Sequence, residues 1–334
     1  MDEASPFTEV METLKNDEKV SVPLLYRFSD MQPEEWEHLQ TVWPTLDDER
    51  RRVIVRHLAD ITEDSYHVDF THFFTMALND PSPAVRLASL DGLWDSEKLS
   101  LINPIIVMMQ SDPDQEVRAR AAGSLGQYIV LGEWEIIPPA KTEPIVEALL
   151  DQMDNPDTSM VVRRAALESL GAAYHPRVPE LITAAYESRR FEMQVSAICA
   201  MGNSADKQWT AAIIEEFEHP DAEMRFMAAR AAGQIGSSDM VDGLIELLED
   251  EDLEVQLTAI ASLGEIGGDV AREALEVLES DPELEDEIHE AVDEALEALF
   301  MMSGMSDFSL LKWDGDDDLE DEENGNWLPF DGEA

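Results

Sequence analysis

Aspartate and arginine recur in this sequence at a fixed spacing, and their side chains can form ion pairs. Before three arginines of the repeat, an aspartate stands six positions earlier: Asp80 before Arg86, Asp112 before Arg118, and Asp157 before Arg163. A carboxylate and a guanidinium at this spacing can connect a turn to the helix that follows it. The spacing weakens further along, because His219 precedes Arg225 and glutamine replaces arginine at Gln194 and Gln256. The pattern is therefore regular in the N-terminal half of the chain and breaks in the C-terminal half.

Residue patterns typical of catalysis or metal binding are scarce. The sequence has no glycine-rich phosphate loop, no Ser/His/Asp set and no Cys/His spacing of a metal site. The one cysteine, Cys199, lies in an apolar helical stretch, which predicts a small buried side chain and excludes an intramolecular disulfide. We therefore predict no catalytic residue, no metal and no cofactor, and we expect a protein that is not an enzyme.

A longer signature, Val-Arg…Ala…Leu-Gly, contains these arginines and repeats along most of the chain. Its second positions are residues 51, 86, 118, 163, 194, 225 and 256, at intervals of 35, 32, 45, 31, 31 and 31. Apolar and small residues within it follow the period of one buried helix face. A second apolar segment and a turn rich in Pro and Asp precede each copy, so the unit is a helix pair. We expect the closing glycine to end its helix in the left-handed conformation.

These units predict an all-α protein, a right-handed α-solenoid of about eight helix pairs over residues 33–302. Residues 1–32 are expected to form a helical cap over the exposed first pair. The interval of 45 places an insertion near residues 128–143. Insertions in repeat arrays form loops on one edge, often the binding edge.

The signature and its Asp-containing turn resemble HEAT repeats, over roughly residues 45 to 300. They are most similar to the short bacterial kind often called phycobilin-lyase HEAT-like. The resemblance implies that the repeated arginines pair with aspartates of the inter-helix turns in a structural ladder and so orient the turns. The concave face of such a solenoid is expected to bind a protein. Deoxyhypusine hydroxylase resembles this fold and binds two irons with repeated His-Glu pairs, but His289-Glu290 is the one such pair here. An enzyme or accessory of the phycobilin-lyase-like class, and a structural assembly subunit, remain alternatives.

Two segments depart from the repeat and carry the candidate partner contacts. In the insertion, Trp134, Ile136 and Ile137 are too apolar for an idle loop, so they either pack on the solenoid or contact a partner. Residues 303–334 contain eleven acidic residues against Lys312, a composition that predicts disorder. Aromatic residues interrupt this tail and can dock on a partner or on the solenoid itself, unless the tail only adds solubility: they are Phe308, Trp313, Trp327 and Phe330.

The net charge of the chain limits which kinds of partner it can bind. The chain has 74 acidic and 22 basic residues, a net charge of −52, which repels nucleic-acid phosphates and anionic lipids. Solubility or adaptation to high salt explains such a charge, and so does a groove for a basic protein. We found no signal peptide and no apolar run long enough to span a bilayer, and expect a cytoplasmic protein. The leading hypothesis is a non-catalytic scaffold or adaptor that binds a protein with a basic surface; its oligomeric state is open.

Overall fold

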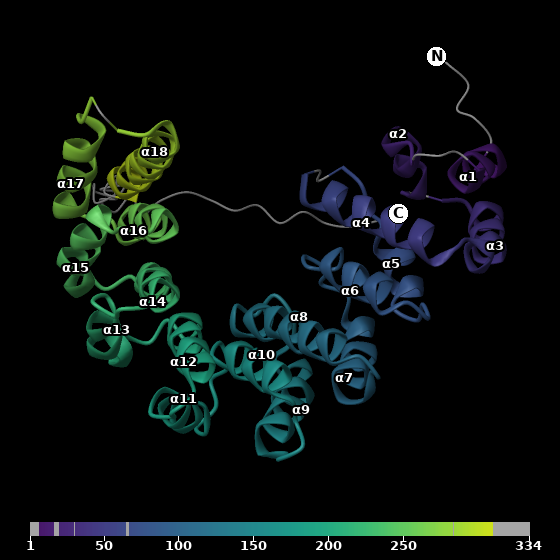
Figure 1. Cartoon of the computed structure of the whole chain (residues 1–334), viewed down its shortest axis with the longest axis horizontal. Coiled ribbons are helices and arrows are strands. Elements are labelled where there is room, and N and C mark those ends of the chain that lie inside the picture. The colour runs from purple at the N-terminus through teal and green to yellow at the C-terminus, as the bar shows by residue number, and fades with distance from the viewer. Residues whose placement is uncertain (1–6, 17–19, 30, 65–66, 283, 310–334) are drawn as a thin grey trace, which may run out of the picture.

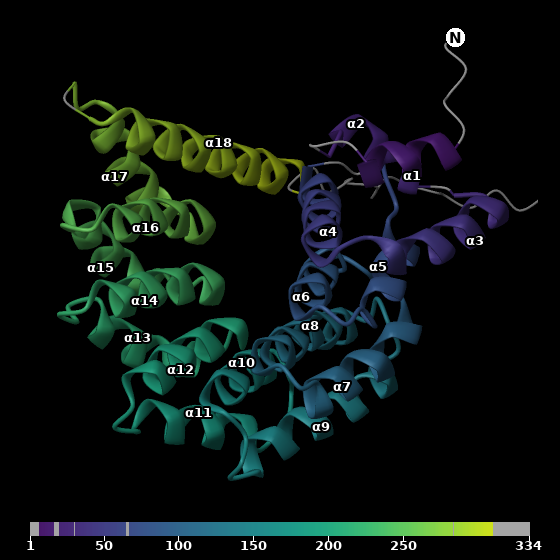
Figure 2. The ribbon, with the colours of Figure 1, turned by 45° about the vertical axis from the view of Figure 1, so that its right-hand side comes forward.

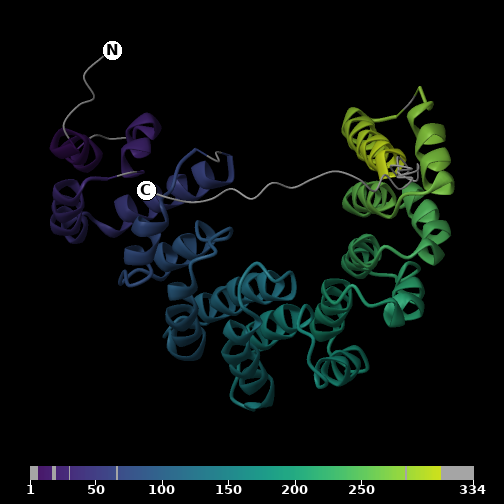
Figure 3. The same cartoon turned by 180° about the vertical axis from the view of Figure 1, so that it is seen from behind.

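The structure is a computed structural model that describes residues 7–16, 20–29, 31–64, 67–282 and 284–309. Every regular element among these residues is a helix, and eight consecutive helix pairs form an open arc (Figures 1 and 3). The predicted α-solenoid is therefore confirmed. The pairs are α3 (Pro33–Val42) and α4 (Asp48–Asp64), α5 (Thr71–Ala77) and α6 (Pro83–Asp91), α7 (Ile102–Ser111) and α8 (Gln115–Glu133), α9 (Glu143–Asp154) and α10 (Met160–Leu170), α11 (Val178–Tyr186) and α12 (Phe191–Asn203), α13 (Thr210–Glu216) and α14 (Ala222–Ile235), α15 (Val241–Glu246) and α16 (Leu253–Ile266), and α17 (Asp269–Glu279) and α18 (Asp286–Ser309).

The second helix of each pair lies on the inner side of the arc, and the first lies on the outer side (Figure 2). The inner helices α8, α10, α12, α14, α16 and α18 contact one another in that order, which makes the concave face continuous. Short 3-10 turns adjoin the helices: η2 (Trp43–Thr45), η3 (Leu99–Leu101), η4 (Pro139–Lys141), η5 (Lys207–Trp209), η6 (Ser238–Met240) and η7 (Leu247–Glu249). Side-chain caps begin three of the inner helices, since Asp114, Asp221 and Asp252 each accept a backbone N–H of the first turn.

The N-terminal elements cover the first pair. These are α1 (Phe7–Asn16), α2 (Val22–Leu25) and η1 (Tyr26–Phe28), and α1 and α2 contact α3 and α4. Phe28 and Trp43 both pack their rings edge-on against Phe73. At the other end, α18 continues to Ser309, past the boundary of the predicted tail at residue 303, and residues 310–334 lie outside the described residues.

The closing glycines of the signature bring neighbouring inner helices together, and our expectation that they adopt a left-handed backbone is wrong. Among the described glycines, positive φ values occur at Gly236, Gly267 and Gly268, none of which closes a signature. A Cβ on Gly171 would instead lie 2.5 Å from the carbonyl oxygen of Ala200, and one on Gly126 would lie 2.9 Å from Oγ of Ser169. Gly202, Gly233 and Gly264 meet α14, α16 and α18 in the same way. Glycine is required at these positions because the neighbouring helix leaves no room for a side chain, and not because the backbone needs an unusual conformation.

The repeated arginine connects two consecutive turns. Arg86 donates from Nη1 to the carbonyl oxygen of Asp80, 2.8 Å away, in the turn that precedes its own helix. Its Nε and Nη2 donate to the two carboxylate oxygens of Asp112, at 2.8 and 2.7 Å, in the turn of the next pair. Arg51 contacts Asp80 and Arg225 contacts Asp250 in the same manner. These ion pairs are nearly buried, so they join successive pairs through charge-assisted hydrogen bonds.

The ion pairs predicted at a separation of six are therefore wrong. For Arg86, Arg118 and Arg225, the residue six positions earlier offers its backbone carbonyl to the arginine, as Asp112 does to Arg118 at 2.6 Å. The carboxylate of Asp112 already accepts hydrogen bonds from Arg86 of the previous pair. It also accepts one from the backbone N–H of Asp114, two residues later, at 2.9 Å. The side chain of an arginine at the start of an inner helix instead extends along the stack to the following turn.

The ladder is interrupted in the middle of the solenoid. In each turn, one side chain accepts a hydrogen bond from the backbone N–H two residues later, as the ladder aspartates do. In three successive turns this side chain is not an aspartate but Asn155, Ser188 or His219. Asn155, and not Asp157, thus occupies the ladder position, and Arg163 donates to the carbonyl oxygen of Asn155 at 2.8 Å. Gln194 and Gln256 likewise bind carbonyl oxygens of their own turns, at 3.1 and 2.6 Å. The exchange of charged for neutral side chains leaves two separate ladder sections.

The second ladder section makes stability depend on pH. Hydrogen bonds from Arg225 hold the pKa of the Asp250 carboxyl below its ordinary value. A lowered folded pKa stabilises the protein above the unfolded value of about 3.9, and this contribution is lost as the pH falls through the folded pKa. In urea unfolding, the deficit of Asp250→Asn relative to the wild type should be full above about pH 5 and shrink below about pH 4. A deficit that stays constant from neutral to acid pH would contradict this, and the exposed Asp239→Asn serves as the control.

Candidate functional site

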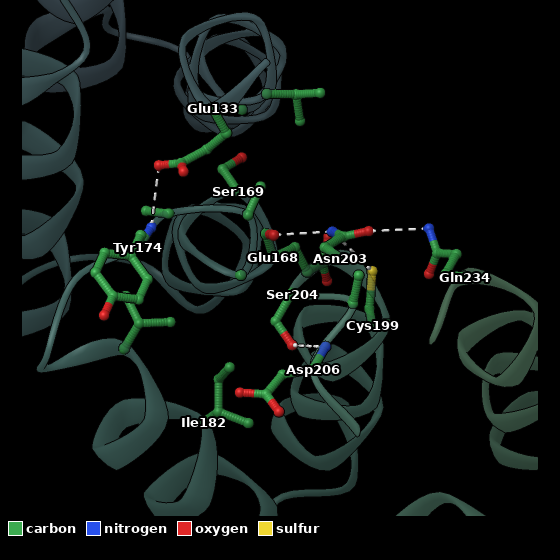
Figure 4. Close-up of a pocket in the computed structure, with 18 of the residues that line it drawn as sticks. Glu133, Glu168, Ser169, Tyr174, Ile182, Cys199, Asn203, Ser204, Asp206 and Gln234 are labelled. Atoms are coloured by element: carbon green, nitrogen blue, oxygen red, sulfur yellow. Dashed lines mark hydrogen bonds between the residues drawn. The ribbon is translucent and has the colours of Figure 1, made fainter. Parts of the chain in front are cut away.

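A cavity of about 950 Å³ lies where the C-terminal halves of the middle inner helices meet the start of α11 (Figure 4). The C-terminal halves of α8, α10, α12 and α14 line it, together with α11 and the turns that follow α10 and α12. The inner helices can form this hollow because small residues stand where they face it. At Gly123 of α8 a Cβ would meet no atom within 4 Å. The cavity therefore occupies space that larger side chains would fill.

Hydrogen bonds near the cavity connect four inner helices. Asn203 of α12 donates from Nδ2 to the carbonyl oxygen of Glu168 in α10, at 2.9 Å. Gln234 of α14 donates to Oδ1 of Asn203 at 3.1 Å, and the chain of bonds is visible in Figure 4. Ser169 adds a bond from its hydroxyl to the carbonyl oxygen of Ala122, at 2.9 Å. These contacts hold the lining in one arrangement, as a binding site requires.

Three carboxylates line the cavity, on Glu133, Glu168 and Asp206. Each accepts hydrogen bonds from neutral groups: Glu133 from the N–H of Tyr174 at 3.2 Å, and Glu168 from the hydroxyl of Ser196 at 2.5 Å. Asp206 accepts from the backbone and the side chain of Gln208, at 2.9 and 2.6 Å. Unlike the ladder aspartates, none of the three has a Lys or Arg ion-pair partner among the described residues.

Aromatic side chains stand exposed at the rim. Trp134 is 71% exposed and Tyr174 is 97% exposed, and both line the cavity, as does the partly buried Trp209. Glu133 directly precedes Trp134 in the chain, and its carboxylate accepts a hydrogen bond from the N–H of Tyr174 (Figure 4). This bond brings the backbone of Tyr174 close to the end of α8, where Trp134 follows. Such large exposed aromatic surfaces beside a cavity are typical of binding sites.

The insertion positions Trp134 through a sharp reversal at the end of α8. Glu135 has a φ of 59°, and the N–H of Ile136 donates back to the carbonyl oxygen of Leu131 at 2.9 Å. Ile137 returns to the core at 5% exposure, whereas Ile136 stays 51% exposed. The sequence left open whether these residues pack on the solenoid or contact a partner. Ile137 packs on the solenoid, while Trp134 and Ile136 remain exposed and can contact a partner.

The other candidate contacts lie beyond what the structure describes. Phe308 falls within α18, but its side chain is not described, and Trp313, Trp327 and Phe330 lie outside the described residues. Their proposed role in docking stays a prediction. The sequence did not reveal Glu133, Glu168, Tyr174 or Trp209 as parts of a site. The one signal for this region was the apolar insertion around Trp134.

The chemistry of the remaining lining residues is modest. Burial raises the pKa of the Cys199 thiol to about 11, and Cys199 accepts a weak hydrogen bond from Asn203 at 3.7 Å. A thiol with this pKa stays protonated at neutral pH and is a poor nucleophile. Within the described ranges, no three His, Cys, Asp or Glu side chains gather as metal ligands would, and no helix there is long and apolar enough to cross a membrane.

Comparisons with known proteins identify the repeat. Residues 210–297, which contain α13 to α17 and the first half of α18, match the family model described as HEAT repeats. No curated protein matches this chain in sequence. The signature in the matched residues is the one that recurs upstream, from Arg51 through Gln194.

Solved structures with a similar architecture are helical-repeat proteins. The complex of CpcE and CpcF of phycocyanin lyase from Nostoc sp. PCC7120 is 20% identical, with a TM-score of 0.45, over 69% of this chain and 94% of that chain. Human deoxyhypusine hydroxylase in complex with glycerol is 17% identical, with a TM-score of 0.36, over 88% of this chain and 96% of that chain. A designed armadillo repeat protein in complex with the peptide (KR)4 is 19% identical, with a TM-score of 0.37, over 61% of this chain and 100% of that chain. The likeness concerns the fold alone.

Proposed function

We propose that this HEAT-repeat solenoid is a non-catalytic protein-binding scaffold that holds a basic segment of a partner on its concave face. The observation that carries the proposal is the cavity itself, which combines exposed aromatic rings with carboxylates that form no ion pair with a Lys or Arg of the described ranges. Extended concave faces of solenoids are suited to bind long segments of other proteins. The excess of 74 acidic over 22 basic residues attracts a cationic segment over a long range and repels anionic ones.

The three cavity carboxylates allow a direct test with a matched control. The first variant combines Glu133→Gln, Glu168→Gln and Asp206→Asn on the concave face. The control combines Glu147→Gln, Asp151→Asn and Glu246→Gln on the outer helices α9 and α15, which do not line the cavity and where all three side chains are exposed. Both variants lose the same charge, so any difference between them reports on location.

Binding is measured by fluorescence anisotropy with a labelled Lys/Arg-rich peptide and with a peptide in which Glu replaces each Lys and Arg. The full chain should bind the basic peptide and not the acidic one at 150 mM NaCl. The concave variant should bind roughly 5- to 30-fold more weakly, since each exposed ion pair contributes up to about 1 kcal/mol, and the outer control should change about twofold or less. Equal losses in both variants would mean non-specific attraction between opposite charges, and would contradict the proposal.

A second candidate is an accessory protein that carries a small chromophore, the phycobilin-lyase-like alternative. The cavity volume of about 950 Å³ lies within the range of small-molecule sites. A visible absorption band in the purified protein would favour this candidate over the scaffold.

A further inference from the structure

We propose that the end of the cavity formed by α8 and the turn after α10 is a receptor site for one arginine side chain of the bound segment. This inference rests on the proposed scaffold function and names the group that the site recognises. The residues that carry it are Glu133, Trp134 and Tyr174, which the structure brings to one part of the rim. Trp134 and Tyr174 lie forty positions apart in the sequence and on different helix pairs.

The rim offers the two features that a guanidinium requires. Flat aromatic faces are accessible on Trp134 and Tyr174, which are 71% and 97% exposed. A cation over such a face is attracted by the ring quadrupole, most strongly over tryptophan. Among the described residues, the carboxylate of Glu133 accepts one hydrogen bond, from the backbone N–H of Tyr174 to its Oε1 at 3.2 Å. Its second oxygen is therefore open to a donor from outside the chain.

The same arrangement favours arginine over lysine. A guanidinium is planar, stacks on aromatic rings and presents several N–H donors in a fixed fork, so it can stack on Trp134 while donating to Glu133. An ammonium is a compact and strongly hydrated charge that loses more hydration for each contact. We therefore expect arginine to bind more tightly than lysine at this end of the cavity.

Arg230 fixes the position of the site within the cavity. It is exposed on α14, and α8, α10, α12 and α14 stand in that order along the concave face. The cationic side chain thus lies at the end of the cavity opposite to Glu133 and Trp134, where it repels a second cation. The α8 end of the cavity is therefore the end that favours a cationic side chain.

The test uses amino-acid amides as probes, because they report on the subsite without the rest of a peptide. N-acetyl-arginine amide, N-acetyl-lysine amide and N-acetyl-citrulline amide are titrated into the full-length chain labelled at its tryptophan indoles, and Nε1–H shifts are followed by NMR. Trp94 is 48% exposed and does not line the cavity, so it is the internal control. Citrulline has the shape of arginine without its charge.

The arginine probe should shift the Trp134 signal saturably, bind roughly 3-fold or more tightly than the lysine probe, and leave Trp94 unchanged. The citrulline probe should bind roughly 10-fold more weakly or not at all. In Glu133→Gln the arginine probe should bind roughly 3- to 10-fold more weakly, and in Tyr174→Ala roughly 2- to 5-fold. Both residues are exposed, so thermal unfolding should match the wild type.

Equal binding of the arginine and citrulline probes would overturn the inference, as would a shift at Trp94 as large as that at Trp134. The outcome separates the two proposals. If the Lys/Arg-rich peptide binds and the concave variant weakens it while the arginine probe leaves Trp134 unshifted, the scaffold stands and the arginine site fails. If neither the peptide nor the arginine probe binds, both proposals fail.

Discussion

Replacing Asp112 by alanine should lower the free energy of unfolding by about 3–5 kcal/mol, the cost of leaving a buried charge without its partner. The carboxylate of Asp112 accepts two hydrogen bonds from Arg86 and one from the N–H of Asp114. The side chains of Asp112 and Arg86 are 6% and 9% exposed, so water cannot replace the lost partner. The change also uncaps the turn before α8.

The measurement is urea unfolding followed by circular dichroism, combined with hydrogen exchange. Because each pair of a solenoid contacts its neighbours alone, the loss should be local, and amides of α6, α7 and α8 should exchange faster than those of α14 and α16. The control is Asp60→Ala, since Asp60 is 57% exposed and lies 3.9 Å from Arg56. This exposed pair should change stability by less than about 0.5 kcal/mol. An Asp112 variant as stable as the control would contradict the structural role of the ladder.

Two identical substitutions, Gly171→Ala and Gly123→Ala, should change stability in opposite directions. A Cβ on Gly171 would lie 2.5 Å from the carbonyl oxygen and 2.8 Å from Cα of Ala200. Both are backbone atoms, so α10 and α12 would have to separate, at a cost of about 1–3 kcal/mol. At Gly123 no atom lies within 4 Å, and alanine in a helix interior stabilises by about 0.5–1 kcal/mol.

The two glycine variants are compared by thermal and urea unfolding of the full chain. Gly123→Ala should raise the midpoint, because Gly123 lies inside α8, where alanine adds helix propensity and its methyl group meets no atom. Gly171→Ala should lower it, because Gly171 is the C-cap of α10 and its methyl group would meet the backbone of α12. Equal increases would mean that close helix approach at Gly171 is unimportant, and equal decreases would contradict the open space at Gly123. The Gly171 variant should also alter the cavity, since Gly171 lines it, and so weaken binding of the basic peptide.

The sequence predicted the site in part. It singled out Trp134 because an apolar residue in an insertion breaks the repeat, and Trp134 does stand at the rim. It could not predict Tyr174, which follows α10 in the next pair and reaches the rim through the hydrogen bond from its N–H to Glu133. The same holds for Glu168 and Asp206, which look like ordinary surface acids until four helices place them around one hollow.

By itself, the sequence determined the helix pairs, their number and their turns, because side-chain period and turn chemistry act between residues a few positions apart. Only the tertiary structure decided how the pairs contact each other. Because the pairs stack, the carboxylate of Asp112 binds Arg86 and not Arg118, and Gly171 packs directly against Ala200. Stacking also brings together the four inner helices that line the cavity. These contacts join residues some thirty positions apart, so they depend on the distance and angle between neighbouring pairs, which no local pattern specifies.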